Sequence, residues 1–570
     1  MNTQPLRLVI VGGVAAGASA AARARRLSET ASITLIERGP DVSFANCGLP
    51  YFIGGEISDR AGLAVQTPQT LKAMLNLDVR TGTEVIAIDR EGKRIQVRIG
   101  ASGVIEWLTY DKLLLAPGAV PVRPQLPGID DPRVYTLRNL QDMDRIKAAA
   151  ASANRVVVIG AGFIGLEMAE QFVRLGKQVT LVEMLEQVLP PLDRPMTMLV
   201  EDELKRRGVE LVLGDGIAGF ASAPAFSCQL KSGRAIETDL VVLAIGVRPD
   251  SALARDASLS LGSRGHIHVD GFMRTSDADI YAAGDAVEVV DFISGDPCAV
   301  PLGGPANRQG RAVADHIFRT ETTQPLPGAL GTAIVRVFDV AAGLTGWSEK
   351  RLRAAGRAYQ AVTVNDNHHA GYFPGAQPII LKLLWEPKSE RVLGAQVTGL
   401  AGVDKRLDVL ATAITGGLTI DRLAQLELAY APPFGAAKDI VNLAGMTACN
   451  ARDGLVDPVD ELPADLNVQI LDVRPPALSQ SHPIPAGGRP ILNIPLAALR
   501  GRLGELDRTR PVVTVCALGK TSYFAARILA QNGFSVRSLT GGLRARFDPH
   551  SPAKPPAVPV VKQPTPMATI

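Results

Sequence analysis

The hydrophobic pattern at the start of the chain is repeated about 150 residues later. Residues 8–11 and 156–159 are uninterrupted apolar runs, and glycines follow each of them directly. A short run of this kind predicts a strand buried on both faces of a parallel sheet. In both places a helix-forming segment follows, and then a second apolar run that ends in a glutamate, Glu37 or Glu183. The order strand, glycine turn, helix, strand is the βαβ unit that binds a dinucleotide, so the chain predicts two such units.

The three-glycine motif is complete in the second unit and incomplete in the first. In the first, Gly12 permits the tight turn and Gly17 lets the helix approach the strand, but Val14 stands at the middle position. In the second, all three positions are glycine: Gly160, Gly162 and Gly165. One loose glycine motif would fit a plain strand-to-helix turn equally well, but two units in one chain make coincidence improbable. The free N–H groups at each helix start can then bind a pyrophosphate.

The two glutamates indicate which nucleotides fit. Glu37 and Glu183 each end the second strand of a unit, where a carboxylate accepts hydrogen bonds from ribose hydroxyls. A carboxylate repels a 2′-phosphate, and the residues directly after Glu183 include no cation. The second unit is therefore predicted to favour NADH over NADPH.

Three further apolar segments connect the units and carry a family resemblance. Residues 110–124 and 238–250 are strands closed by turns with glycine and proline, and residues 277–287 run into Gly284 and Asp285. This arrangement resembles the flavoprotein disulfide reductases with two dinucleotide-binding domains. The resemblance implies FAD in the first unit and the nicotinamide nucleotide in the second. Asp285 would bond the ribityl-phosphate region of FAD, although a loop acid with no ligand is the alternative. The implied cofactor residues are Gly12, Gly17, Glu37, Arg38, Asn46, Gly118 and Asp285 for FAD, and Gly160, Gly162, Gly165, Glu183 and Gly246 for NADH.

Cys47 lies in the segment SFANCGLPY, residues 43–51. Most members of that superfamily have a CxxxxC pair, but here the fifth residue after Cys47 is Phe52. A single thiol cannot cycle through an internal disulfide; it can attack a substrate disulfide or persulfide, or be oxidised to a sulfenic acid. The segment resembles the single-cysteine branch that contains coenzyme A disulfide reductases, NADH oxidases and peroxidases. The alternative is a small buried apolar residue.

Other residues separate the members of this branch. The oxidases and peroxidases have a histidine in the first glycine loop, where this chain has Ala15 and Ala16. Residues 367–376 and 428–440 resemble the coenzyme A disulfide and persulfide reductases, and the resemblance implies that Tyr372 and Tyr430 act at the cysteine of a partner subunit. Ordinary buried tyrosines are the alternative. The surrounding region resembles the interface domain of these reductases, which implies a homodimer.

Coenzyme A carries phosphates and needs cations. Candidates by position are Arg23, Arg26, Ser43, Arg308 and Lys438, with arginines of an ordinary exposed helix as the alternative for Arg23 and Arg26. Leu75 falls about where a coenzyme A disulfide reductase has a lysine, which leaves room for smaller persulfides as substrates.

The C-terminal region from residue 459 to 548 resembles a single rhodanese domain. Cys516 ends an apolar strand, and the loop CALGKTS that follows leads into a helix. Backbone N–H groups in such a loop form a nest for a thiolate or persulfide. Rhodaneses often have an arginine at the sixth position of the loop, where this chain has Thr521 preceded by Lys520. Loss of that guanidinium would weaken thiosulfate binding more than persulfide transfer, and the pattern leaves the preferred sulfur donor open. A structural domain without activity is the alternative.

Composition limits the remaining possibilities. The 570 residues are enough for about four domains, and the net charge of +3 argues against nucleic acid as a partner. Five cysteines without a CxxC pair, no leader and no 18-residue apolar span favour a cytoplasmic protein without a membrane anchor or metal site. The expected class is α/β with two Rossmann-like dinucleotide-binding domains, an α+β dimerisation domain and an α/β rhodanese domain. The expected boundaries are 1–150 with 270–326 for FAD, 151–269 for NAD, 327–450 for dimerisation, 459–548 for the rhodanese domain, and a disordered proline-rich tail at 549–570.

Together these features predict an FAD-dependent, NADH-oxidising reductase of coenzyme A disulfide, persulfides and polysulfides. Cys47, Tyr372 and Tyr430 would carry the reduction, and Cys516 would handle sulfane sulfur. An NADH oxidase or peroxidase is the alternative enzyme. A flavoprotein redox sensor or sulfur-delivery protein, in which the cysteines trap ligands without turnover, is the alternative from another class.

Overall fold

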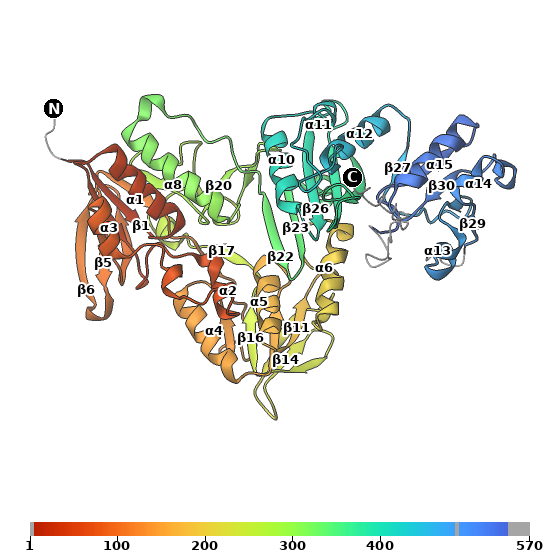
Figure 1. Cartoon of the computed structure of the whole chain (residues 1–570). Helices are drawn as coiled ribbons and strands as arrows, with labels where there is room; N and C mark the ends of the chain where they lie inside the picture. Colours follow the sequence, from red (N-terminus) through yellow and green to blue (C-terminus); the bar gives the residue numbers. More distant parts are fainter. Residues whose placement is uncertain (1–4, 485–488, 545–570) are drawn as a thin grey trace, which may run out of the picture.

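The computed structural model describes residues 5–484 and 489–544, and within these residues four five-stranded sheets form the centres of the structure (Figure 1). Two are parallel and lie in the N-terminal half, one is antiparallel, and one is parallel and C-terminal. The tail at 549–570, predicted to be disordered, lies outside the described residues.

The first sheet is built around the N-terminal apolar run. Its order is β19 (Ile280–Ala282), β7 (Lys112–Leu115), β1 (Arg7–Val11), β2 (Ser32–Ile36) and β3 (Asp78–Arg80). Helices α1 (Ala15–Leu27) and α8 (Gly303–Phe318) pack against each other, and buried alanines of α1 make this close approach possible. Because β19 and α8 come from after the second unit, the chain returns to the first sheet.

The second sheet repeats this plan. Its order is β12 (Glu210–Leu213), β11 (Gln178–Glu183), β10 (Arg155–Ile159), β16 (Leu240–Leu243) and β9 (Val134–Thr136). Helix α5 (Phe163–Arg174) follows β10 as α1 follows β1, and its buried face contributes Leu166, Met168 and Phe172 to the core. The strands β8 (Ala119–Pro121) and β17 (Val247–Pro249) pair in antiparallel fashion and connect the two units.

Smaller antiparallel ribbons flank these sheets. They are β4 (Thr83–Asp89), β5 (Arg94–Ile99) and β6 (Val104–Thr109) beside the first, and β13 (Ile217–Ala221), β14 (Ser227–Leu230) and β15 (Ala235–Glu237) beside the second.

The third sheet is antiparallel and has the order β22 (Ala333–Val337), β23 (Val340–Gly346), β26 (Val392–Gly399), β25 (Pro378–Trp385) and β24 (Gln360–Asn367). Helices α10 (Val403–Thr415) and α12 (Ile440–Arg452) share a buried apolar core with it. β24 is an edge strand, so the outer row of its backbone groups is not paired within this sheet.

The fourth sheet has the order β27 (Pro458–Val459), β31 (Val536–Leu539), β30 (Val512–Val515), β28 (Gln469–Asp472) and β29 (Ile491–Asn493). Helix α15 (Lys520–Gln531) follows β30 after a short loop. The sheet lies at the far end of the molecule from the first unit, coloured blue in Figure 1. In the described part of the chain, no helix combines the length and apolar character needed to cross a membrane.

Candidate active site

A large cavity of about 2010 Å³ extends across both dinucleotide units. Its wall contains both glycine turns, both strand-ending glutamates and Cys47. Other lining residues come from late segments of the chain, among them Asp285 and Arg308. The fold therefore brings most of the residues singled out in the sequence to one continuous space.

The glycine turns are shaped by close backbone contacts. Gly12 has φ of +99°, and a Cβ there would lie 2.0 Å from the carbonyl oxygen of Ala116. A Cβ on Gly17 would lie 1.8 Å from Gly12 O, and one on Gly165 would lie 1.8 Å from Gly160 O. The starts of α1 and α5 thus lie so close to the ends of β1 and β10 that a side chain at these positions would clash with the backbone.

The middle position of the motif differs between the units. Gly162 has no atom within 4 Å of where a Cβ would stand, and it lines the cavity, so a ligand can approach its backbone closely. Val14 lines the cavity at the corresponding place in the first unit, where it occupies the N-cap position of α1 without a side-chain capping bond. The helix N–H groups of both units remain directed at the cavity.

Both glutamates are held in place by backbone N–H groups. Glu37 accepts hydrogen bonds from Gly13 N (2.9 Å) and Gly39 N (2.8 Å), and Glu183 accepts them from Ala161 N (2.8 Å) and Leu185 N (3.0 Å). Each carboxylate keeps further lone pairs for ribose hydroxyls. Lys231, which no sequence pattern singled out, follows β14 and lines the same cavity as Asp215. Only the folded structure brings Lys231 to this cavity, because it is 48 positions after Glu183 in the chain.

The remaining predicted cofactor residues also line the cavity. Asn46, Gly118 and Gly246 lie in its wall, and Asp285 forms an ion pair with Arg138 at 3.3 Å. Arg38 pairs with Asp250 at 2.9 Å, which links the first unit to the strand pair between the units. Two glycine turns, the carboxylates of Glu37 and Glu183 and one continuous cavity fit two dinucleotides.

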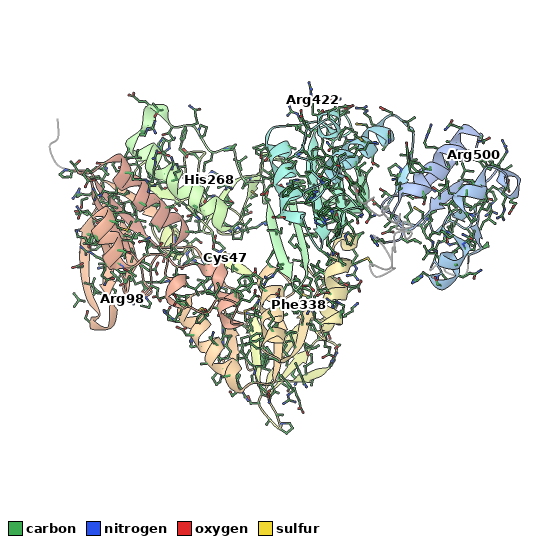
Figure 2. All side chains as sticks on the ribbon, in the orientation of Figure 1. Cys47, Arg98, His268, Phe338, Arg422 and Arg500 are labelled. Carbon is green, nitrogen blue, oxygen red and sulfur yellow. The ribbon has the colours of Figure 1, made fainter. Side chains whose placement is uncertain are left out.

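Cys47 lies on a short 3₁₀ turn (Asn46–Gly48) that leads into α2 (Leu49–Ile53). It is a free thiol on the cavity wall, and its Sγ lies 3.8 Å from Asn46 Oδ1 (Figure 2). Burial of the sulfur raises the pKa of Cys47, the charges of Glu167 and Asp285 raise it further, and Arg138 lowers it. Among the described residues, the cavity wall contains no second cysteine, so this thiol has no partner for an internal disulfide.

Glu167 is a second residue that the sequence analysis missed. It lies on the first turns of α5, lines the cavity and accepts a hydrogen bond from Tyr51 Oη at 3.0 Å. Burial raises the pKa of Glu167 to about 7, and the Tyr51 bond opposes that rise. Its position two residues after Gly165 was a usable signal, since a helix that starts at the cavity also directs its first side chains there.

Replacement of Glu167 by glutamine should make the Cys47 thiol more reactive at alkaline pH. Above pH 7 the Glu167 carboxylate is mostly ionised and raises the pKa of Cys47, whereas below pH 7 it is mostly neutral. Glu167→Gln should therefore speed iodoacetamide labelling of Cys47 about two- to fivefold at pH 8. At pH 6 the labelling rate should change little. Mass spectrometry of the Cys47 peptide gives the rate, and Glu84→Gln on the distant strand β4 is the matched control. A Glu167→Gln effect of equal size at both pH values would contradict this coupling.

Tyr372 and Tyr430 lie side by side on the antiparallel domain, with their hydroxyl oxygens 3.0 Å apart. They are 74% and 48% exposed, and neither belongs to the described wall of the cavity. One chain therefore does not bring them to its own Cys47. The alternative of ordinary buried tyrosines does not fit this exposure.

The predicted phosphate-binding residues are only partly brought together. Arg23 and Arg308 lie on the packed helices α1 and α8, and Arg308 lines the cavity. Arg23 is paired with Asp315 at 2.5 Å and is mostly buried, so it is less available to a phosphate than the exposed Arg26. Ser43 has φ of +51° and donates its backbone N–H to Gly13 O. Lys438 is exposed on the antiparallel domain, away from these helices.

Cys516 occupies a separate site on the fourth sheet. It follows β30, is buried, and its sulfur accepts a hydrogen bond from Gly519 N at 3.1 Å and donates one to Ser522 Oγ at 3.3 Å. Gly519, with φ of +92°, caps the start of α15, so the sulfur lies at a helix N-terminus. Lys520 and Thr521 are both exposed. Figure 2 shows this domain, marked by Arg500, far from Cys47 in the same chain.

Comparisons with known proteins agree with this layout. Residues 6–306 match the pyridine nucleotide-disulphide oxidoreductases, residues 332–440 match the dimerisation domain of that class, and residues 455–546 match the rhodanese-like domain. The coenzyme A disulfide reductase of Staphylococcus haemolyticus is 34% identical over 444 residues, which are 78% of this chain and 99% of that protein.

Two solved structures are similar over nearly the whole chain. The reduced CoADR-RHD of Bacillus anthracis is 44% identical with a TM-score of 0.92, over 95% of this chain and 97% of that one. The NAD-dependent persulfide reductase from A. fulgidus is 40% identical with a TM-score of 0.89, over 95% of this chain and 100% of that one. These matches confirm the predicted resemblance and fold class, and they support the two predicted nucleotide cofactors. The chain belongs to the pyridine nucleotide-disulphide oxidoreductase family, with a dimerisation domain and a C-terminal rhodanese-like domain.

Proposed function

We propose that this protein is a homodimeric, FAD-dependent reductase that oxidises NADH and reduces coenzyme A disulfide, persulfides and polysulfides at Cys47. The observation that carries the proposal is a lone free thiol on the wall of a cavity that spans two dinucleotide sites. Similarity to a coenzyme A disulfide reductase and a persulfide reductase supports the substrate class.

The single thiol determines the chemistry. The Cys47 thiolate attacks one sulfur of a substrate RS–SR′, forms a Cys47–S–SR bond and releases R′S⁻. FAD, when bound, would supply two electrons derived from NADH, and reduction of the mixed disulfide with them would restore the Cys47 thiolate and release RS⁻. With a persulfide RS–SH, attack on the outer sulfur releases RS⁻ and leaves Cys47–S–SH, and two electrons then release HS⁻ and restore the Cys47 thiolate. One cysteine is enough because the substrate provides the second sulfur.

Cavity residues then have separate tasks. Glu37 and Asp285 would hold FAD, and Glu183 would hold the ribose of NADH. Glu167, whose pKa of about 7 leaves it partly protonated at neutral pH, is positioned to exchange protons near Cys47. The cavity wall that holds the exposed Cys47 thiol also contains the apolar residues Phe44, Leu49 and Pro50.

The homodimer accounts for the exposed tyrosines. Tyr372, Tyr430 and the 71% exposed Phe434 form an aromatic patch on the dimerisation domain. In a symmetric dimer such a patch can complete the cavity of the other subunit, where the paired hydroxyls would donate hydrogen bonds to the departing sulfur. All five cysteines are free, a pattern typical of a reducing compartment such as the cytoplasm.

The rhodanese domain extends the proposal to sulfane sulfur. Its thiol loop lies against β24, and β24 leads through His368 and His369 to Tyr372. Strand β24 therefore joins the thiol loop of the rhodanese domain to the segment whose Tyr372 would serve the cavity of the partner subunit. We therefore propose that Cys516 collects sulfane sulfur for the flavin site of the partner.

Anaerobic NADH oxidation with a panel of substrates tests the proposal. Coenzyme A disulfide, coenzyme A persulfide, glutathione persulfide and polysulfide should each support turnover, with sulfide released from the last three. NADPH should be about tenfold less efficient than NADH because Glu183 repels a 2′-phosphate. NADH consumption that requires oxygen or peroxide would instead identify an oxidase or peroxidase. Flavin reduction without turnover on any substrate would favour a redox sensor.

A further inference from the structure

The rhodanese domain is attached to the edge of the dimerisation sheet by its active-site region. The Thr540 hydroxyl accepts a hydrogen bond from Thr363 N at 2.8 Å and donates one to Thr363 O at 3.0 Å. These bonds satisfy outward-facing backbone groups of the edge strand β24. Thr363 and Thr540 are both buried, so solvent is excluded from this contact.

Two residues further along β24, Asn365 reaches the loop that holds Cys516. Its side-chain amide nitrogen donates to Gly541 O at 2.6 Å and to Leu518 O at 3.3 Å. Its amide oxygen is buried and has no hydrogen-bond partner among the described residues. The donor end of this side chain, and not its acceptor end, therefore makes the contact with the rhodanese loop.

The Leu518 carbonyl and the Gly519 N–H belong to one peptide group. They point in opposite directions because a trans peptide is planar. Asn365 holds the carbonyl end, and the N–H end points at Cys516 Sγ at 3.1 Å. Rotation of this peptide would remove the N–H from the sulfur. Gly519 has φ of +92°, and glycine tolerates many backbone conformations. The residue itself therefore does little to fix the orientation of the Leu518–Gly519 peptide, and a hydrogen bond from Asn365 can fix it.

The turn at Gly541 reinforces this anchor. A Cβ on Gly542 would lie 2.5 Å from Gly519 N and 2.7 Å from Cys516 O, so the turn and the loop pack as one unit. The second Asn365 bond, to Gly541 O, therefore fixes the same loop from its other side.

We propose that Asn365, a residue of the dimerisation sheet, is a positioning residue for the rhodanese thiol. Its amide holds the Leu518–Gly519 peptide so that the Gly519 N–H stabilises negative charge on the sulfur of Cys516. The rhodanese site is then complete only when the domain is docked on β24. The inference rests on the sulfurtransferase role proposed above.

The reaction that this N–H assists is a sulfur transfer. The Cys516 thiolate attacks the outer sulfur of thiosulfate, an S–S bond forms, and sulfite leaves with the electron pair of the old S–S bond. The product is a Cys516 persulfide anion, and cyanide then takes its outer sulfur as thiocyanate and regenerates the thiolate. Sulfur-centred anions are present throughout, so a misdirected N–H should slow the chemical step more than it weakens donor binding.

Full-length Asn365→Leu removes the donor with little change in shape, and Asn365→Asp replaces it with a carboxylate facing two carbonyls. With thiosulfate or glutathione persulfide as donor and cyanide as acceptor, both variants should lose about tenfold in kcat, while KM for the donor stays within about twofold. Coenzyme A disulfide reduction by the same preparations should match the parent protein, which shows that β24 and the dimerisation sheet are intact.

Thr540→Val is the matched control, because it removes the bonds to Thr363 and leaves Asn365 in place. It should retain most of the parent kcat for sulfur transfer. An unchanged kcat in both Asn365 variants would overturn the inference, and so would an equal loss in Asn365→Leu and Thr540→Val, which would assign the effect to docking as a whole. If the parent protein transfers no sulfur while Cys516 is intact, the sulfurtransferase role itself is wrong and the inference falls with it.

Discussion

Replacement of Cys47 by serine should abolish reduction of every disulfide and persulfide while the protein still binds FAD. Serine has nearly the shape of cysteine, and the cavity wall outside the sulfur is unchanged, so the flavin should still be bleached by NADH under anaerobic conditions. A serine hydroxyl is a far weaker nucleophile toward sulfur than a thiolate. We expect a loss on the order of a thousandfold or more in kcat, about 4 kcal/mol of transition-state stabilisation. Steady-state NADH oxidation with coenzyme A disulfide and with glutathione persulfide measures it.

The half-buried Cys298 provides the matched control, since it is also a free thiol and lies outside the cavity wall described here. Cys298→Ser should retain turnover. Persulfide reduction that persists in Cys47→Ser would show that electrons reach the substrate directly and that Cys47 is not the nucleophile.

The parts of this protein that could be predicted from sequence are those encoded by short-range patterns. Gly12 with Gly17 and Gly160 with Gly165 are forced by contacts within one βαβ unit, so the motif and the structure must agree. The return of β19 to the first sheet was predicted because the strand before Asp285 matches a family segment. Cys47 was found because the expected second cysteine is absent from a recognisable stretch.

Residues that depend on packing between distant segments were not predicted. Tyr51 and Glu167 are 116 positions apart and meet only because α2 packs against α5. Lys231 reaches the second unit from the β13–β15 ribbon, and no local sequence pattern predicts where this ribbon packs. Asn365 had no sequence signal at all, because the role proposed for it arises from a contact with a domain more than 150 residues further along the chain.

Arg23 illustrates the limit of a helix pattern. Its spacing from Arg26 predicted a shared cationic face, but the structure pairs Arg23 with Asp315 of α8. A helix pattern shows which residues share a face and does not show whether the neighbouring helix carries a carboxylate. Arg26 and Arg308 remain the better candidates of this group for a phosphate, because no ion pair of either appears in the described part of the chain and Arg308 lines the cavity.

Replacement of Cys516 by serine should separate the two activities of the chain. Cys516 lies on the domain farthest from the Cys47 of its own chain (Figure 2), and soluble coenzyme A disulfide can reach Cys47 directly. We therefore expect Cys516→Ser to reduce coenzyme A disulfide at the parent rate. Sulfide release from elemental or polymeric sulfur should fall by about tenfold or more, because the proposed route for such donors passes through the Cys516 thiol. Parallel assays of NADH oxidation and sulfide production on one preparation measure both.

The linker limits how this sulfur can travel. α12 ends at Arg452 and β27 begins at Pro458, so five residues connect the dimerisation and rhodanese domains. A flexible linker of that length spans only about 12 Å on average, and the bonds of Thr540 and Asn365 to β24 restrict the domain further. These contacts oppose a long swing of the whole domain, so in the proposed pathway sulfur would leave Cys516 on a small carrier such as coenzyme A. Polymeric sulfur reduction by Cys516→Ser should consequently stay low when coenzyme A is added, whereas the parent protein should be stimulated by it. Equal rates in both proteins would make the rhodanese domain a separate sulfurtransferase, and loss of coenzyme A disulfide reduction in Cys516→Ser would place Cys516 within the reductase site itself.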